Sequence, residues 1–129
     1  MIYLFLLIGD KIIKYFLFIT SRNFLINEGM FFGINTSQLV TLFISLLIIG
    51  ILYVFKKRFG VRHTGLNIII CGITMNISDR FLWGGVIDYI KFYNILSFNL
   101  ADIIILIGML AVIYSYISQN AKLSIGSQK

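Results

Sequence analysis

The 129-residue sequence contains no proline, one cysteine, one histidine and only five acidic residues. A single cysteine, Cys71, excludes an internal disulfide and any metal site built from cysteines alone. The single histidine, His63, lies in a basic stretch away from the acidic residues, so a Ser-His-Asp triad or a histidine metal site cannot be assembled beside them. The glycines show no phosphate-binding spacing of the G-x-x-x-x-G-K type. The carboxylates therefore become the main candidates for chemistry.

Apolar residues dominate what is present. They make up 59% of the chain, and the mean hydropathy is +0.95, whereas soluble domains are about half apolar. The net charge of +6 does not indicate nucleic-acid binding, because the basic residues are not spread along a polar face. Lys56, Lys57, Arg58 and Arg62 crowd between two apolar runs instead, which is typical of a cytoplasmic loop. The composition predicts a membrane protein without nucleic-acid partners.

The apolar residues fall into four segments, each close to the ~20 residues that cross a bilayer. These segments are residues 2–19, 39–55, 66–82 and 100–118. They predict an all-α membrane protein in which residues 1–129 form one domain with four transmembrane helices. The first segment has no basic region before it and no small-x-small cleavage site after it, so we expect it to remain as a helix.

The basic residues predict the orientation of these helices. More of them flank one end of the predicted spans than the other, which places both termini in the cytoplasm. Trp83, Tyr89 and Tyr93 then lie at the outer interface, where anchoring in the membrane is the expected role of aromatic residues.

Charged residues inside the apolar segments need partners or a function, because a carboxylate at membrane depth costs a few kcal/mol. Asp10 and Lys14 have the i, i+4 spacing of an ion pair, and we favour that role over a catalytic one. Lys11 should point elsewhere and reach the membrane surface. Near the end of the third segment, Asp79 and Arg80 form an expected Asp-Arg pair with Asn76 beneath it. This group could satisfy the polar end of a helix or support a neighbouring site, and we favour the second.

Asp88 and Asp102 are the candidate catalytic pair. Asp88 is flanked by apolar and aromatic residues in the third connection, and Asp102 opens the fourth segment at the same expected interface. Asp102 also has a structural interpretation, because with Asn99 as N-cap it occupies the N3 position of a helix. Two carboxylates close together share a proton, so one acts as base and the other as acid in amide hydrolysis. The spacing permits this pair but does not prove it.

The ordered motifs resemble those of the lipoprotein signal peptidase family, and they cover most of the chain. The four blocks are Asp10-x-x-x-Lys14, Asn27-Glu28-Gly29-Met30-Phe31-Phe32-Gly33, Gly72-x-x-x-Asn76-x-x-Asp79-Arg80 with Val86-Ile87-Asp88-Tyr89, and Phe98-Asn99-x-Ala101-Asp102. Met30 and Phe31 stand where the family has small alanines. The chain is also shorter than typical members in two of its connections.

The resemblance implies a four-helix enzyme of the bacterial cytoplasmic membrane with a reduced outer β-structured cradle. It would cleave the signal peptide of a prolipoprotein before its diacylglyceryl-modified cysteine, at the extracytoplasmic face, with Asp88 and Asp102 as catalytic residues. The positions that match the family's substrate-binding and supporting residues are Asn27, Gly29, Asn76, Asp79, Arg80, Asn99, Asp10 and Lys14. The resemblance implies no metal or organic cofactor. The expected partners are the prolipoprotein and membrane lipid, and the expected state is a monomer.

Two alternatives belong to other classes of protein. The shortened connections and the bulky Met30 and Phe31 would suit a non-catalytic homologue that binds lipidated peptides. A small channel or holin-like protein would explain four spans but would leave the matched Asn and Asp positions as coincidence.

Overall fold

The computed structural model of the protein describes residues 2–20, 24–27, 38–59, 63–93 and 96–126. The chain is mostly helical, as expected, with short strands between the helices. The elements in chain order are α1 (Ile2–Ile19), β1 (Leu25–Asn27), α2 (Gln38–Phe59), α3 (His63–Trp83), β2 (Val86–Asp88), β3 (Ile90–Phe92), β4 (Leu96–Phe98) and α4 (Leu100–Gly126).

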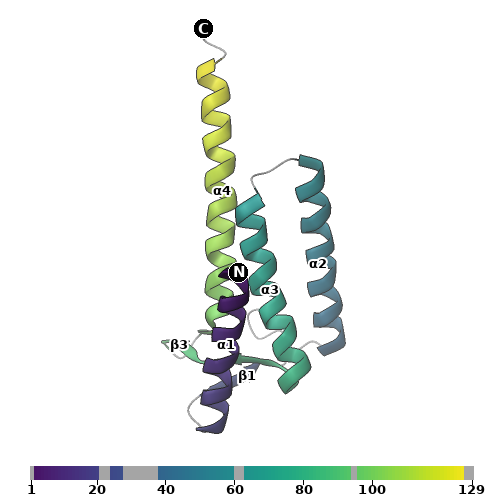
Figure 1. Cartoon of the computed structure of the whole chain (residues 1–129), viewed down its shortest axis with the longest axis vertical. Helices are drawn as coiled ribbons and strands as arrows, with labels where there is room; N and C mark the ends of the chain where they lie inside the picture. The colour runs from purple at the N-terminus through teal and green to yellow at the C-terminus, as the bar shows by residue number, and fades with distance from the viewer. Residues whose placement is uncertain (1, 21–23, 28–37, 60–62, 94–95, 127–129) are drawn as a thin grey trace.

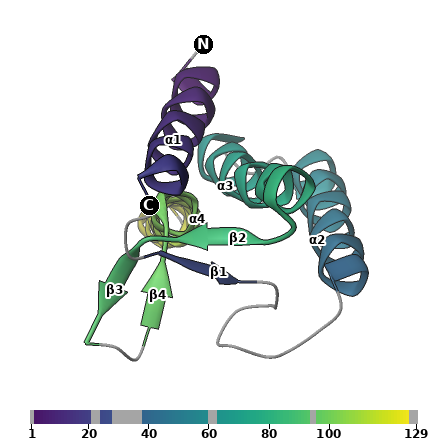
Figure 2. The same ribbon diagram turned by 90° about the horizontal axis from the view of Figure 1, so that it is seen from below.

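Consecutive helices run in opposite directions, so the strands gather at one end of the bundle (Figure 1). Helix α3 lies between α2 and α4, and α4 extends well beyond its neighbours at the other end. Seen from the strand end, β1 and β2 lie across the bundle while the β3–β4 hairpin projects to one side (Figure 2). Strand β1 pairs antiparallel with β2, and β3 pairs antiparallel with β4. The strand end is therefore where residues from all parts of the chain meet.

Glycines allow α3 and α4 to pack with their backbones nearly in contact. A Cβ atom added at Gly108 would lie 2.8 Å from the backbone nitrogen of Ile69, and one added at Gly72 would lie 2.7 Å from the carbonyl oxygen of Ala101. Small residues serve such close approaches between membrane helices. Buried apolar side chains fill the interface on both sides of this seam, among them Met75 and Ile104. Helix α3 thus provides a fixed support for the start of α4.

Gly84 ends α3 and redirects the chain into β2. Its φ angle of 75° lies in the left-handed region that glycine adopts without strain. Its backbone N–H donates to the carbonyl of Arg80 at 3.2 Å, which satisfies one of the last helical carbonyls. This turn brings Val86–Asp88 alongside β1.

The distribution of polar and apolar side chains is the reverse of that in soluble proteins. Large apolar side chains such as Phe5, Phe43 and Phe81 are more than 65% exposed, whereas Asp10 and Lys14 are fully buried. In water this arrangement would be unfavourable, because charged residues are almost never buried and apolar patches of this size are rare on monomers. Within the described helices, the Leu100–Ser118 stretch of α4 is long and apolar enough to cross a membrane, and only about a fifth of it is buried.

Candidate active site

Asp88 is held by amide donors on both of its carboxylate oxygens. It ends β2 and is only 2% exposed. Its Oδ1 accepts a hydrogen bond from Asn99 Nδ2 at 2.8 Å, and its Oδ2 accepts one from Asn27 Nδ2 at 3.1 Å. Asn27 reaches this position because it ends β1, which pairs with β2. The β1–β2 pair therefore brings together two residues that are 61 positions apart.

Asp102 forms the capping box that the sequence predicts. The Asn99 side-chain oxygen accepts from the backbone N–H of Ala101 at 2.8 Å, and in return the Asn99 backbone N–H donates to Asp102 Oδ2 at 3.0 Å. The other carboxylate oxygen, Oδ1, accepts from Asn76 Nδ2 at 2.9 Å. Asp102 is thus fixed by its own helix on one side and by α3 on the other.

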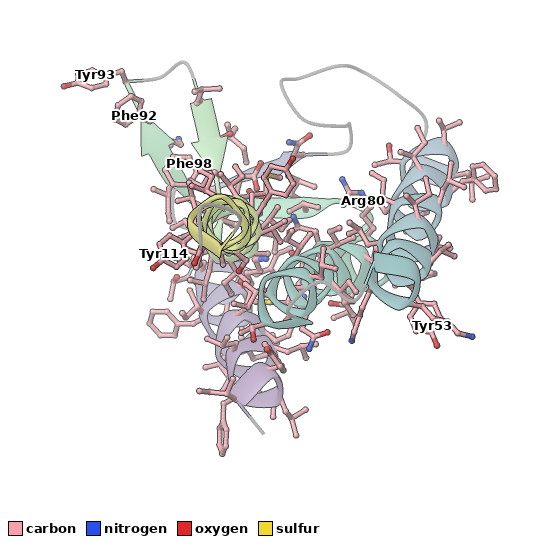
Figure 3. The ribbon with its side chains drawn as sticks, turned by 90° about the horizontal axis from the view of Figure 1, so that it is seen from above. Tyr53, Arg80, Phe92, Tyr93, Phe98 and Tyr114 are labelled. Carbon is pink, nitrogen blue, oxygen red and sulfur yellow. The ribbon has the colours of Figure 1, made fainter. Side chains whose placement is uncertain are left out.

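Both carboxylates line one cavity of about 370 Å³ between α2, α3, α4 and the strands. The polar part of its wall also contains Asn27, Asn76 and Arg80. Figure 3 shows Arg80 on the side of α3 that faces α2 and the strands, whereas Tyr53 and Tyr114 point away from the bundle. Aliphatic side chains from all three helices line the rest of the cavity: Ile44, Ile48, Leu52, Ile69, Ile73, Ile105 and Met109. Asp88 and Asp102 therefore line a cavity whose walls are otherwise largely apolar.

Burial raises the pKa of the Asp88 carboxyl above its ordinary value. The hydrogen bonds from Asn99 and Asn27 act in the opposite direction because they favour the ionised form, while the nearby Asp102 raises the pKa further. Burial and the neighbouring Asp102 therefore both favour the protonated form of Asp88, and hydrolysis of an amide by a carboxyl pair requires one protonated member.

A second cluster of charges joins α1 to α3. The Asp10–Lys14 ion pair expected from the spacing is present, with Lys14 Nζ 2.9 Å from Asp10 Oδ2, and both side chains are fully buried. Lys14 also binds Asp79, so Asp79 forms ion pairs with α1 rather than serving mainly as the expected partner of Arg80. The cluster holds α1 against the bundle with matched charges.

The expectation that Lys11 points elsewhere is wrong. Its ammonium binds Asp79, donates to the carbonyl of Met75 at 3.0 Å and lies 5.3 Å from the centre of the Trp83 ring. The physical reason is charge balance, since Asp10 alone cannot neutralise two neighbouring lysines in a low-dielectric interior. The sequence carried this signal, because two lysines on one apolar segment require a second carboxylate from elsewhere in the chain.

Sequence reasoning also missed several residues beside the site. Tyr89, for which anchoring at the membrane interface is the favoured expectation over a substrate contact, is half-buried, and its hydroxyl accepts a hydrogen bond from the Leu100 backbone N–H at 3.3 Å. Thr41 and Ser45 line the cavity from α2, and their i, i+4 spacing in an otherwise apolar segment was the available signal. Gly29, a predicted site residue, lies outside the described residues.

Comparisons of the sequence with known proteins identify its family. The sequence profile of the signal peptidase (SPase) II family matches residues 2–118. The chain is 35% identical over 116 residues to the lipoprotein signal peptidase of Clostridium novyi (strain NT), covering 79% of this chain and 75% of that protein. It is 30% identical over 100 residues to the lipoprotein signal peptidase of Chlamydia pneumoniae, covering 70% of this chain and 60% of that protein.

The fold is similar to that of a solved bacterial membrane enzyme. The superposition has a TM-score of 0.81 and covers 94% of this chain and 88% of the other, at 22% sequence identity. The likeness shows a shared fold, while the profile over residues 2–118 and the relatives above identify the lineage. The chain belongs to the signal peptidase II family.

Proposed function

We propose that this protein is a membrane aspartic endopeptidase that cleaves the signal peptide of bacterial prolipoproteins before the diacylglyceryl-modified cysteine. The observation that carries the proposal is the pairing of Asp88 and Asp102 through Asn99 at one end of a largely apolar cavity. The relatives named lipoprotein signal peptidase, which match most of this chain, support the same substrate class.

Asp88 and Asp102 are the proposed catalytic residues, and the pair works with one shared proton. The ionised carboxylate takes a proton from a water molecule as the water oxygen attacks the scissile carbonyl carbon. The protonated carboxyl donates its proton to the carbonyl oxygen, which gives a neutral tetrahedral intermediate. The C–N bond then breaks as one carboxyl gives its proton to the leaving nitrogen, while the other carboxylate takes a proton from a hydroxyl of the intermediate, which becomes the carboxylic acid product. One water is consumed, and the pair returns to its singly protonated state.

The surrounding residues have proposed supporting roles. Asn27 and Asn99 hold Asp88, while Asn76 and Asn99 hold Asp102. Arg80 lines the same cavity, and its guanidinium donates to the carbonyl of Asn76 at 3.2 Å. Asp10, Lys14 and Asp79 fix α1 against α3. The apolar walls of the cavity suit a substrate that carries lipid.

The proposed placement is multi-pass in the bacterial cytoplasmic membrane. All four helices cross the bilayer, both termini are cytoplasmic, and the strand end with its two aspartates lies at the extracytoplasmic face. The charges within α1 and α3 are compatible with spanning because Lys11, Lys14, Asp10 and Asp79 neutralise one another. The enzyme acts as a monomer within membrane lipid.

Complementation in a bacterium depleted of its own lipoprotein signal peptidase tests the proposed function. Expression of this chain should remove the accumulated diacylglyceryl prolipoprotein, whereas Asp88→Asn and Asp102→Asn should not, at equal amounts of protein in the membrane. Asn67→Ala is the matched control, because Asn67 accepts its hydrogen bond from Lys56, near the end of α2 that is remote from the strands. Uncut prolipoprotein in cells that express the unaltered chain would show that the proposal is wrong. Lipopeptide binding without turnover, unchanged by Asp102→Asn, would support the non-catalytic homologue.

A further inference from the structure

Tyr89 makes a second link between the Asp88 segment and the start of α4. The Asp88 carboxylate binds the side chain of Asn99, and the next residue, Tyr89, accepts a hydrogen bond at its hydroxyl from the backbone N–H of Leu100. Both links join residues eleven positions apart. They lie at the base of the β3–β4 hairpin, immediately before the pairing of Ile90 with Phe98. Two adjacent residues therefore hold the two residues at which α4 begins.

The hydroxyl of Tyr89 completes the cap of α4. The first backbone N–H groups of a helix have no partner within the helix. The Asn99 side-chain oxygen accepts from Ala101 and Asp102, which leaves the N–H of Leu100 to be satisfied from outside the capping box. Tyr89 supplies that acceptor at 3.3 Å. The phenol thus fixes the first turn of α4, which carries Asp102.

We propose that Tyr89 is a positioning residue for the peptidase reaction, because its hydroxyl sets the start of α4 and hence the place of Asp102 relative to Asp88. This inference rests on the proposed function of the aspartate pair. Tyr89 differs in this respect from Tyr93, which is 82% exposed near the tip of the same hairpin, far from the helices (Figure 3). Removal of the hydroxyl should therefore lower the peptidase activity at Tyr89 and leave it unchanged at Tyr93.

The inference has a consequence for the pH profile. The charged groups that act on Asp88 are Lys14 from α1 and Asp102 from α4, and Arg80 from α3 interacts with both aspartates. A looser first turn would let Asp102 move away from Asp88, which weakens the repulsion that makes the pair retain its shared proton. The shared proton would then be lost at a lower pH. The alkaline limb of the activity profile should therefore move to lower pH.

The test compares Tyr89→Phe with the matched control Tyr93→Phe in the purified, full-length protein. The measurements are kcat and KM for a diacylglyceryl lipopeptide, the pH profile, and hydrogen exchange at the Leu100 amide. In Tyr89→Phe we expect kcat to fall about fivefold, as for the loss of one neutral hydrogen bond. KM should be unchanged, the alkaline limb should shift to lower pH, and the Leu100 amide should exchange faster. Tyr93→Phe should match the unaltered protein in all four measurements.

The inference is overturned if Tyr89→Phe keeps its kcat and pH profile, or if kcat falls only in proportion to a loss of folded protein with the profile unchanged. An unaltered protein that fails to cleave the lipopeptide overturns the proposed function instead. The positioning role for the peptidase reaction falls with the proposed function in that case, and hydrogen exchange at Leu100 then tests only whether Tyr89 caps α4.

Discussion

At the scale of single residues, Asn99 performs two tasks with one side chain. Its oxygen caps α4 by accepting from Ala101, and its nitrogen donates to Asp88. The residue is fully buried, so water cannot replace either hydrogen bond. The stability of the helix and the position of the Asp88 carboxylate therefore depend on the same amide group.

Two substitutions at Asn99 should separate these tasks. Serine is about as good an N-cap as asparagine, but it lacks the amide donor for Asp88. Asn99→Ser should keep the cap of α4 while kcat falls about tenfold, as expected for losing a hydrogen bond to a charged group. Asn99→Ala should lose a further ~1 kcal/mol of unfolding free energy with the cap. Thermal unfolding in detergent and a cleavage assay measure the two effects, and equal stability of the two variants would contradict the capping role.

Asn27 should control the pH profile of the pair. Its donor to Asp88 favours the ionised carboxylate, so Asn27→Ala should raise the pKa of Asp88 above the value that burial already gives it. The limb on which the pair loses its shared proton should therefore move to higher pH, opposite to the shift expected for Tyr89→Phe. Rates measured across the pH range check this, with Asn67→Ala as the control. A limb that stays in place would contradict the role of Asn27.

At the scale of elements, contacts within one helical turn could be predicted, but contacts between distant elements could not. The Asp10–Lys14 pair and the Asn99–Asp102 capping box follow from spacings of four and three residues, and both are present. The Lys11–Asp79 pair joins residues 68 positions apart. Strand β1, which delivers Asn27, is only three residues long and has no pattern that a sequence could reveal. The sequence therefore predicts which residues form the site, but it predicts only some of the contacts between them.

The charge cluster should contribute most of what holds α1 to α3. Lys14 is fully buried and binds both Asp10 and Asp79, whereas the Lys11 side chain is 18% exposed. Lys14→Met leaves buried carboxylates without their shared cation, which typically costs about 3–5 kcal/mol. Lys11→Met should cost less, because Lys14 still binds Asp79 and the Lys11 side chain is itself partly exposed.

Unfolding of both lysine variants in the same detergent provides the measurement. Lys91→Met, an exposed position on β3, is the control and should leave stability unchanged. A larger loss for Lys11→Met than for Lys14→Met would show that the cluster is not organised around Lys14.

At the scale of the whole molecule, the inverted distribution of polarity explains how so short a chain can build a site. The bilayer solvates the exposed apolar faces, so the interior can hold charges and amides. Buried positions such as Asp79, Asp88 and Asn99 can therefore carry polar side chains, because hydrogen bonds and ion pairs as well as apolar packing hold the interior together. The apolar composition and the placement of the charged residues in the sequence predict this membrane environment.

Site-directed labelling tests the proposed orientation. With Cys71→Ala as background, a single cysteine is introduced by Tyr93→Cys at the hairpin or by Lys57→Cys near the end of α2. Both positions are exposed. A membrane-impermeant thiol reagent should label the first variant in intact spheroplasts and the second only after the membrane is opened. The reverse pattern would place the strand end in the cytoplasm.

The most direct test of the central claim is mass spectrometry of a diacylglyceryl prolipoprotein after incubation with the purified protein. If Asp88 and Asp102 are the catalytic pair, the prolipoprotein is cleaved into two products at the bond on the N-terminal side of the modified cysteine. The same assignment also predicts that Asp88→Asn and Asp102→Asn, folded to the same extent, leave the prolipoprotein intact. Cleavage that persists in either variant, or an uncut prolipoprotein with the unaltered protein, would contradict the assignment of Asp88 and Asp102 as the catalytic pair.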